Sequence, residues 1–197
     1  MSQAHAATLD DATSTGIPSA KLGMWLFLAS EIMFFAGLFA TYVVLRMGHP
    51  AWPGPEGHLS VPLGTINTFV LIGSSMTMVM ALAASERGAL PALRGWLGAT
   101  IALGAVFLGI KGFEYSTKFA HHIFPSTNVF WSCYYALTGL HALHVIGGMG
   151  LNAWVLSMTR ASSLWQRRGH LLELMGLYWH FVDVVWIFLF PVLYLMN

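Results

Sequence analysis

Two acidic residues stand inside apolar stretches that are each long enough to cross a lipid bilayer. Glu31 has Phe27, Phe34 and Phe35 about one helical turn away, and Asp183 lies within a run of valine, tryptophan and phenylalanine residues. An ionised carboxylate at the centre of a bilayer costs about 2.5–3.5 kcal/mol on insertion scales. We therefore expect each group to be protonated, paired with another helix, or used as a site for a proton, a lipid headgroup or a neighbouring subunit.

Further polar residues in the last apolar stretch share a helical stripe with Asp183. Glu173, His180 and Asp183 are separated by seven and three positions, so a helix places all three on one side. One interpretation is a proton relay or a metal site. The other is an internally paired polar seam, in which His180 and Asp183 bond each other or a facing helix. We favour the seam because nothing in the sequence fixes the remaining ligands of a metal.

A histidine pair lies in the fourth apolar stretch. His141 and His144 are three positions apart and would share a helix face, from which they could bind a metal ion or haem iron. A bis-histidine haem site in a bundle needs matching histidines on a second helix, and His180 is the one histidine well inside another apolar stretch. We therefore expect no haem here, and we place both histidines in the predicted intramembrane polar seam.

Two further polar groups predict structural roles. Lys111, Glu114 and Lys118 have spacings of three and four at the end of the third apolar stretch, which is typical of an ion-paired helix end at the membrane interface. Ser74 and Ser75, with Asn67 about two turns earlier, are expected to bond across helices or to their own backbone carbonyls.

The composition indicates an integral membrane protein. Of the 197 residues, 56% are hydrophobic and 9% are charged, which leaves too little polar surface for a soluble globule of this size. The net charge is +1 and no basic run occurs, so we expect no nucleic-acid partner. The single cysteine, Cys133, cannot form an internal disulfide or supply the paired thiolates of an iron–sulfur, binuclear copper or structural zinc site.

The apolar stretches predict an all-α integral membrane protein. Crossing about 30 Å of hydrocarbon takes roughly 20 helical residues. Five stretches are long enough, and they cover about 22–46, 62–84, 94–115, 128–158 and 171–195. We expect a five-transmembrane-helix bundle over residues 21–197, because backbone groups in lipid must bond within their own segment. The small and polar residues of 1–20 predict a flexible cytoplasmic tail.

The basic residues predict the orientation of the bundle. One side has six of them, Lys21, Arg87, Arg94, Arg160, Arg167 and Arg168, whereas the other side has Arg46, Lys111 and Lys118. Because lysine and arginine accumulate on the cytoplasmic side, we expect the N-terminus inside and the C-terminus outside.

A long motif in the last stretch, YWHFVDVVWIFLF over residues 178–190, resembles the closing signature of subunit III of haem-copper terminal oxidases. Other matches follow in the family's order: WLFLASE over 25–31, Asn67-Thr68 with Ser74-Ser75, Phe113-Glu114-Tyr115 and GLHALHV over 139–145. The resemblance covers residues 21–197. It is to the bacterial short form, which has five helices where the long form has seven.

The resemblance implies a subunit of the bacterial inner membrane that has no catalytic residue, metal or redox cofactor of its own. The implied partners are subunit I, whose haems and copper reduce dioxygen while protons are pumped, subunit II and other subunits of the complex, and, as a further assembly, a respiratory supercomplex. Its implied role is to stabilise subunit I, bind phospholipid and support proton uptake. The nearest matches to the family's lipid contacts are Glu31, Arg168 and His170. His170 departs from the pattern, because it is three positions before Glu173 where the family has four.

Three alternatives remain open from the sequence. A subunit III of a quinol oxidase, or an accessory subunit of nitric oxide reductase, would share this architecture. An independent proton-coupled channel or transporter that uses Glu31 and Asp183 belongs to a different class, and co-purification with haem-copper partners would argue against it.

Overall fold

The computed structural model describes residues 18–55, 57–160 and 171–196. The described chain forms five long α-helices: α2 (Ser19–Gly48), α3 (Val61–Glu86), α4 (Leu90–Ala120), α5 (Val129–Met158) and α7 (Leu171–Phe190), the last of which continues into a π-helical turn, η1 (Pro191–Leu195). The predicted all-α class is confirmed, and each predicted stretch lies on one of these helices. Of the predicted tail, residues 1–17 lie outside the described residues, and α2 already begins at Ser19.

Four helices in the described ranges, α2, α3, α4 and α7 with η1, are long and apolar enough to cross a membrane. Together with the composition, they make this a membrane protein. The fifth helix, α5, is 30 residues long, as is α2. It does not meet the same criterion of hydropathy, so a fifth crossing and the orientation of the termini stay predictions.

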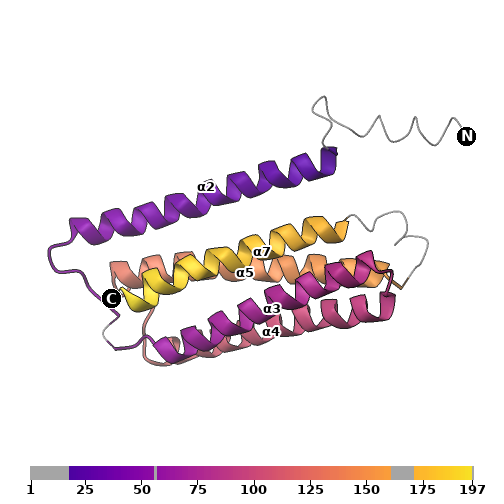
Figure 1. Ribbon diagram of the computed structural model, residues 1–197. Helices are drawn as coiled ribbons and strands as arrows, with labels where there is room; N and C mark the ends of the chain where they lie inside the picture. Colours follow the sequence, from indigo (N-terminus) through magenta and orange to yellow (C-terminus); the bar gives the residue numbers. More distant parts are fainter. Residues whose placement is uncertain (1–17, 56, 161–170, 197) are drawn as a thin grey trace, which may run out of the picture.

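The helices divide into a tight four-helix group and one outlying helix (Figure 1). The group consists of α3, α4, α5 and α7: α3 packs along α4 and α7, and α5 packs against α4 and α7. The outlying helix is α2, which contacts α7 and α5. Along α2, most apolar side chains are exposed, and only Phe35 and Tyr42 are buried.

Glycines of the four-helix group make room for the aromatic side chains of α7 and η1. A Cβ atom added to Gly148 of α5 would lie 2.9 Å from the Trp179 ring, and one added to Gly104 of α4 would lie 3.0 Å from the same ring. On α3, a Cβ atom on Gly64 would lie 2.9 Å from the ring of Tyr194. Because each of these contacts is too short for a side chain, glycine at these three positions allows the rings to lie against the neighbouring helices.

Local signals in the sequence set the helix ends. Asn128 precedes α5, and its side-chain oxygen accepts a hydrogen bond from the Trp131 backbone N–H at 2.9 Å, as expected for a helix N-cap. Gly88 has a φ of +68° in the short turn between α3 and α4, a conformation that glycine adopts without steric cost.

Candidate functional site

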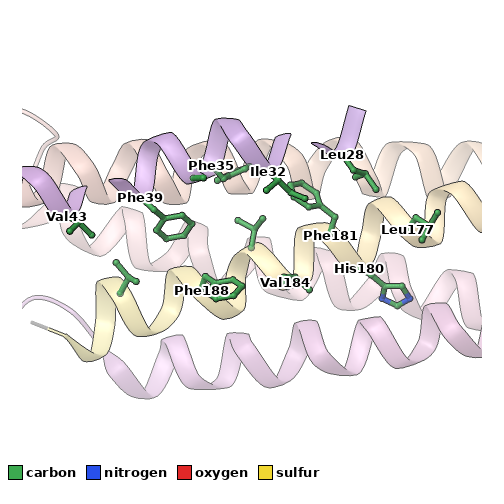
Figure 2. A pocket seen from close by; sticks show the side chains of 13 residues that line it. Leu28, Ile32, Phe35, Phe39, Val43, Leu177, His180, Phe181, Val184 and Phe188 are labelled. Carbon is green, nitrogen blue, oxygen red and sulfur yellow. The ribbon is translucent and has the colours of Figure 1, made fainter. Parts of the chain in front are cut away.

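A groove with a volume of about 790 Å³ separates α2 from α7 (Figure 2). One wall consists of Leu28, Ile32, Phe35, Ala36, Phe39 and Val43 of α2, and the other of Leu177, His180, Phe181, Val184, Val185 and Phe188 of α7 with Val192 of η1. His180 is the polar member of this lining, and Figure 2 shows its ring directed away from α2. A long apolar groove on a membrane helix suits hydrocarbon chains better than any polar ligand.

Glu31 of α2 is joined to α5 through His144. The Glu31 Oε2 atom lies 3.0 Å from His144 Nε2, and His144 Nδ1 lies 2.8 Å from the Leu140 carbonyl oxygen. Because a carbonyl only accepts, Nδ1 is the nitrogen that donates. His144 Nε2 then either accepts a hydrogen bond from the hydroxyl of a protonated Glu31 or, as imidazolium, donates one to its carboxylate. Pairing with another helix, one of the outcomes expected for Glu31, is the one that this contact shows.

His141 lies in a different environment from His144, although the two were predicted to share a face. The His141 ring is buried with 1% exposure, packed at centroid distances of 5.5 Å from Phe107 and 5.2 Å from Trp186. Neither of its ring nitrogens has a hydrogen-bond partner among the described residues. The two histidines therefore do not converge on one ligand position.

His180 and Asp183 both lie beside Ser75 of α3. The Ser75 hydroxyl is 2.6 Å from His180 Nδ1, so His180 bonds the facing helix, which was one of the two pairings expected for the polar seam. Asp183 is buried with 4% exposure, and neither carboxylate oxygen has a partner that meets hydrogen-bond geometry in the described part of the chain. A buried intramembrane carboxyl group of this kind is a candidate for a functional role.

Glu173 does not join His180 and Asp183, although all three lie on α7. Its carboxylate pairs with the Lys21 ammonium of α2 at 2.5 Å, and the Glu173 side chain is 49% exposed. The pair ties the beginning of α2 to the beginning of α7 at the bundle surface. Two other predicted lipid contacts, Arg168 and His170, lie outside the described residues. Within the described ranges, no three histidine, cysteine, aspartate or glutamate side chains are grouped closely enough to hold a metal ion.

The most extensive polar site lies toward the end of α4. Lys111, Glu114 and Lys118 of α4 are ion-paired as predicted, with Nζ–carboxylate distances of 2.9 Å from Lys111 and 2.7 Å from Lys118. They are buried inside the bundle, with exposures of 3–4%, which the sequence did not indicate, and their position at the membrane interface stays a prediction. Tyr134 of α5 and Tyr194 of η1 donate hydrogen bonds to Glu114 at 3.0 and 2.8 Å.

We call these five residues, Lys111, Glu114, Lys118, Tyr134 and Tyr194, the charged cluster. The Lys111 ammonium also bonds the Tyr194 hydroxyl and lies 4.7 Å from the centre of the Trp186 ring. The cluster joins α4, α5 and η1 at the end of the bundle where the chain terminates (Figure 1). The charged residues were visible in the sequence, but no spacing along the chain linked them to tyrosines 20 and 80 positions away.

Comparison with known proteins identifies the family. The model of the family described as cytochrome c oxidase subunit III matches residues 4–197, almost the whole chain. The chain belongs to the cytochrome c oxidase subunit III family. The resemblance drawn from the α7 motif and the residues around Glu31 is therefore confirmed.

Several curated relatives are named cytochrome c oxidase subunit 3. The protein of Thermostichus vulcanus is 42% identical over 179 residues, which cover 89% of this chain and 87% of that protein. The protein of Synechocystis is 42% identical over 185 residues, covering 92% and 78%. The protein of Alkalihalophilus pseudofirmus is 36% identical over 197 residues, covering 94% and 96%. The similarity thus extends through all five described helices.

Proposed function

We propose that this chain is the non-catalytic subunit III of a respiratory haem-copper oxygen reductase of the cytochrome c oxidase type, in the inner membrane of a bacterium. Its partners are then subunit I, which holds the haems and copper, subunit II and bound phospholipid. The observation that carries the proposal is the family match over residues 4–197. All five long helices cross the membrane in this account, α5 included, with the N-terminus inside and the C-terminus outside.

Stabilisation of subunit I is supported by the way the four-helix group is built. Its interior is filled by large rings, and the charged cluster links α4, α5 and η1. Such a group keeps its shape when it meets a neighbour, because the buried ion pairs and tyrosine hydroxyls of the charged cluster are satisfied only in one arrangement. Its outward faces are apolar, which suits contact with the membrane helices of a larger subunit.

Lipid binding is supported by the groove between α2 and α7. The groove is apolar along its length and is bounded by the Glu31–His144 pair on α2 and α5, with Lys21 and Glu173 near one end. A phospholipid has matching chemistry, since its acyl chains are apolar and its headgroup is charged. Arg168 and His170 precede α7 in the sequence and remain candidates for the headgroup.

A role in proton uptake is supported by the ionisable groups within the helices. Glu31 with His144, and Asp183 with His180 and Ser75, are carboxyl groups that lie near titratable or hydroxyl side chains. Carboxyl and imidazole groups inside membranes commonly mark proton pathways. In this proposal they supply and hold protons near the catalytic subunit and take no part in oxygen chemistry.

The proposal is tested by purifying the native complex through an affinity tag on this chain. We expect haem absorbance, copper and oxygen reduction to co-purify with it, and the tag to capture subunits I and II. Oxidation of reduced cytochrome c or of quinol by the same preparation distinguishes the two donor classes, and nitric oxide consumption tests the reductase alternative. A chain that purifies alone and moves protons across liposomes, with loss of transport in Asp183→Asn, would instead favour the channel or transporter.

A further inference from the structure

The charged cluster has more positive than negative charge. Lys111 and Lys118 are two ammonium groups with 4% and 3% exposure, and Glu114 is the one described carboxylate that acts on either of them. Moving an ammonium group away from water without full compensation is costly, so buried charges are normally paired. The cluster as described leaves one positive charge to be balanced by an anion.

A polar pocket opens directly beside Lys118. It has a volume of about 360 Å³ and lies between the segment that precedes α3 and the last turn of α4. His58, Ser60, Lys118 and His121 contribute polar groups to its lining, and no acidic side chain is among the described lining residues. The rings of His58 and His121 lie 5.7 Å apart, one from each side of the pocket. Ammonium, imidazole N–H and hydroxyl groups are all donors suited to an oxyanion.

We propose that this pocket binds a phosphate group, either as the headgroup of an anionic phospholipid or as phosphate from solution. Lys118 supplies the charge: one of its three donors is used by Glu114 Oε1 at 2.7 Å, which leaves donor capacity for a second anion. His58 and His121 hold the oxyanion from two sides and Ser60 donates its hydroxyl. The bound phosphate balances the excess charge of the cluster.

The pocket is distinct from the groove between α2 and α7, since the two share no lining residue. The groove is apolar and suits acyl chains, whereas the pocket is small and rich in donors. A divalent cation is the competing occupant, because two histidine rings at this separation can share a metal ion. The neighbouring ammonium of Lys118 and the lack of acidic lining residues in the described chain favour an anion.

The test is isothermal titration calorimetry on the purified, delipidated complex in phosphate-free buffer. The probes are dihexanoyl phosphatidylglycerol, dihexanoyl phosphatidylcholine, inorganic phosphate and Zn²⁺. The variant His58→Ala/His121→Ala removes two donors at exposed positions and leaves the buried charged cluster intact. The matched control is His49→Ala, an exposed histidine of the same connection that does not line the pocket.

We expect the anionic lipid or inorganic phosphate to bind at least about a hundredfold more weakly to the double histidine variant than to the native complex and the control, because two charge-assisted hydrogen bonds are lost. Phosphatidylglycerol binding in preference to phosphatidylcholine, with competition by inorganic phosphate, identifies the headgroup as the source. Binding of inorganic phosphate alone identifies the solute. Equal anion binding by all three proteins, or Zn²⁺ binding without phosphate binding, would overturn the proposal.

Glu56 requires a separate variant in the titration, because it precedes His58 by two positions and lies outside the described residues. If its carboxylate competes with phosphate, Glu56→Gln binds the anion more tightly than the native protein, and unchanged affinity shows that it does not compete. Either result supports the proposal. Phosphate binding that appears only in Glu56→Gln would contradict it for the native chain.

Discussion

The two sides of the α7–η1 unit are held in contrasting ways. On one side, the charged cluster ties η1 to α4 and α5 through buried ion pairs and tyrosine hydroxyls, and glycines of α3 and α5 allow close contact with Tyr194 and Trp179. On the other side, α7 faces α2 across an apolar groove. The described polar links of α2 include the partly exposed pairs of Glu31 and Lys21 and the hydrogen bonds of Tyr42 and Arg46 to backbone carbonyls of η1 and Met196.

This difference indicates that the four-helix group and the α2 helix have different roles. The four-helix group is expected to be rigid, because the ion pairs of the charged cluster form only in the assembled arrangement. The α2 helix has no buried ion pair among the described residues, and between its polar links it faces α7 across the apolar groove, which suits the retention of lipid. The following changes test whether the two regions differ as much as the contacts indicate.

The largest expected effect is that of Glu114→Gln in the charged cluster. The substitution leaves two buried ammonium groups without a carboxylate, and breaking a buried pair in this way costs about 3–5 kcal/mol. We expect loss of the chain from the purified complex and a much lower melting temperature. Glu173→Gln is the matched control, because it removes a carboxylate from an exposed pair worth at most about 1 kcal/mol. Similar melting temperatures for both variants would erase the contrast between the two regions.

A second test targets the close approach of α5 and α7. In Gly148→Ala the new Cβ atom meets the Trp179 ring at 2.9 Å, and overpacking of this kind costs about 1–3 kcal/mol. Gly150→Ala on the same helix has no neighbouring atom within 4 Å and should be neutral or slightly stabilising. Thermal unfolding of the purified complex, followed by tryptophan fluorescence, measures both. Equal stability of the two variants would mean that α5 and α7 are not closely packed at this point.

The third test asks whether the bond between Glu31 and His144 affects the rate of oxygen reduction or only the lifetime of the complex. Glu31→Ala removes the bond to His144, and we expect a nearly normal initial rate of oxygen reduction with about two- to tenfold faster inactivation during turnover. Glu31→Gln keeps a side chain that can still bond His144 Nε2, so its lifetime should lie closer to that of the native complex. Oxygen uptake followed to the end of turnover gives both quantities. An immediate, complete loss of activity in an assembled complex would imply that Glu31 takes part in the chemistry.

The smallest effect is expected for Ser75→Ala at the boundary between the two regions. The variant loses one hydrogen bond to His180, which contributes about 1 kcal/mol. Ser157→Ala is the control, because that hydroxyl donates to the carbonyl of Trp154 on its own helix and is exposed. A shift of the melting temperature in Ser75→Ala, but none in Ser157→Ala, would assign His180 to the four-helix group. No difference between the two would leave His180 as a lining residue of the groove alone.

Much of the fold could be predicted from the sequence because bilayer thickness and backbone bonding restrict the choice to apolar helices. The predicted stretches 62–84 and 128–158 nearly coincide with α3 and α5. The contact partners were harder to predict. The spacing of Glu173 and Asp183 shows a shared stripe, but it does not show that Lys21 of another helix removes Glu173 from the interior.

The candidate site was likewise only partly predictable from the sequence. A partner on another helix was one of the outcomes expected for Glu31, and the structure supplies it as His144 of α5. His141 and His144 share a helix face in projection, yet three residues correspond to about 300° of rotation, and this offset sends one ring to the core and the other to α2. The burial of the charged cluster could not be predicted from the spacing on α4, because it depends on side chains of α5 and η1.

The central claim is that this chain holds a partner and lipid in place and has no redox centre of its own. Metal analysis of the purified complex, before and after gentle detergent removal of this chain, tests that claim most directly. We predict that all haem iron and copper stays with the remaining subunits, and that phospholipid leaves with this chain. Iron or copper that leaves with the chain in a fixed ratio, bound by its own side chains, would contradict the account.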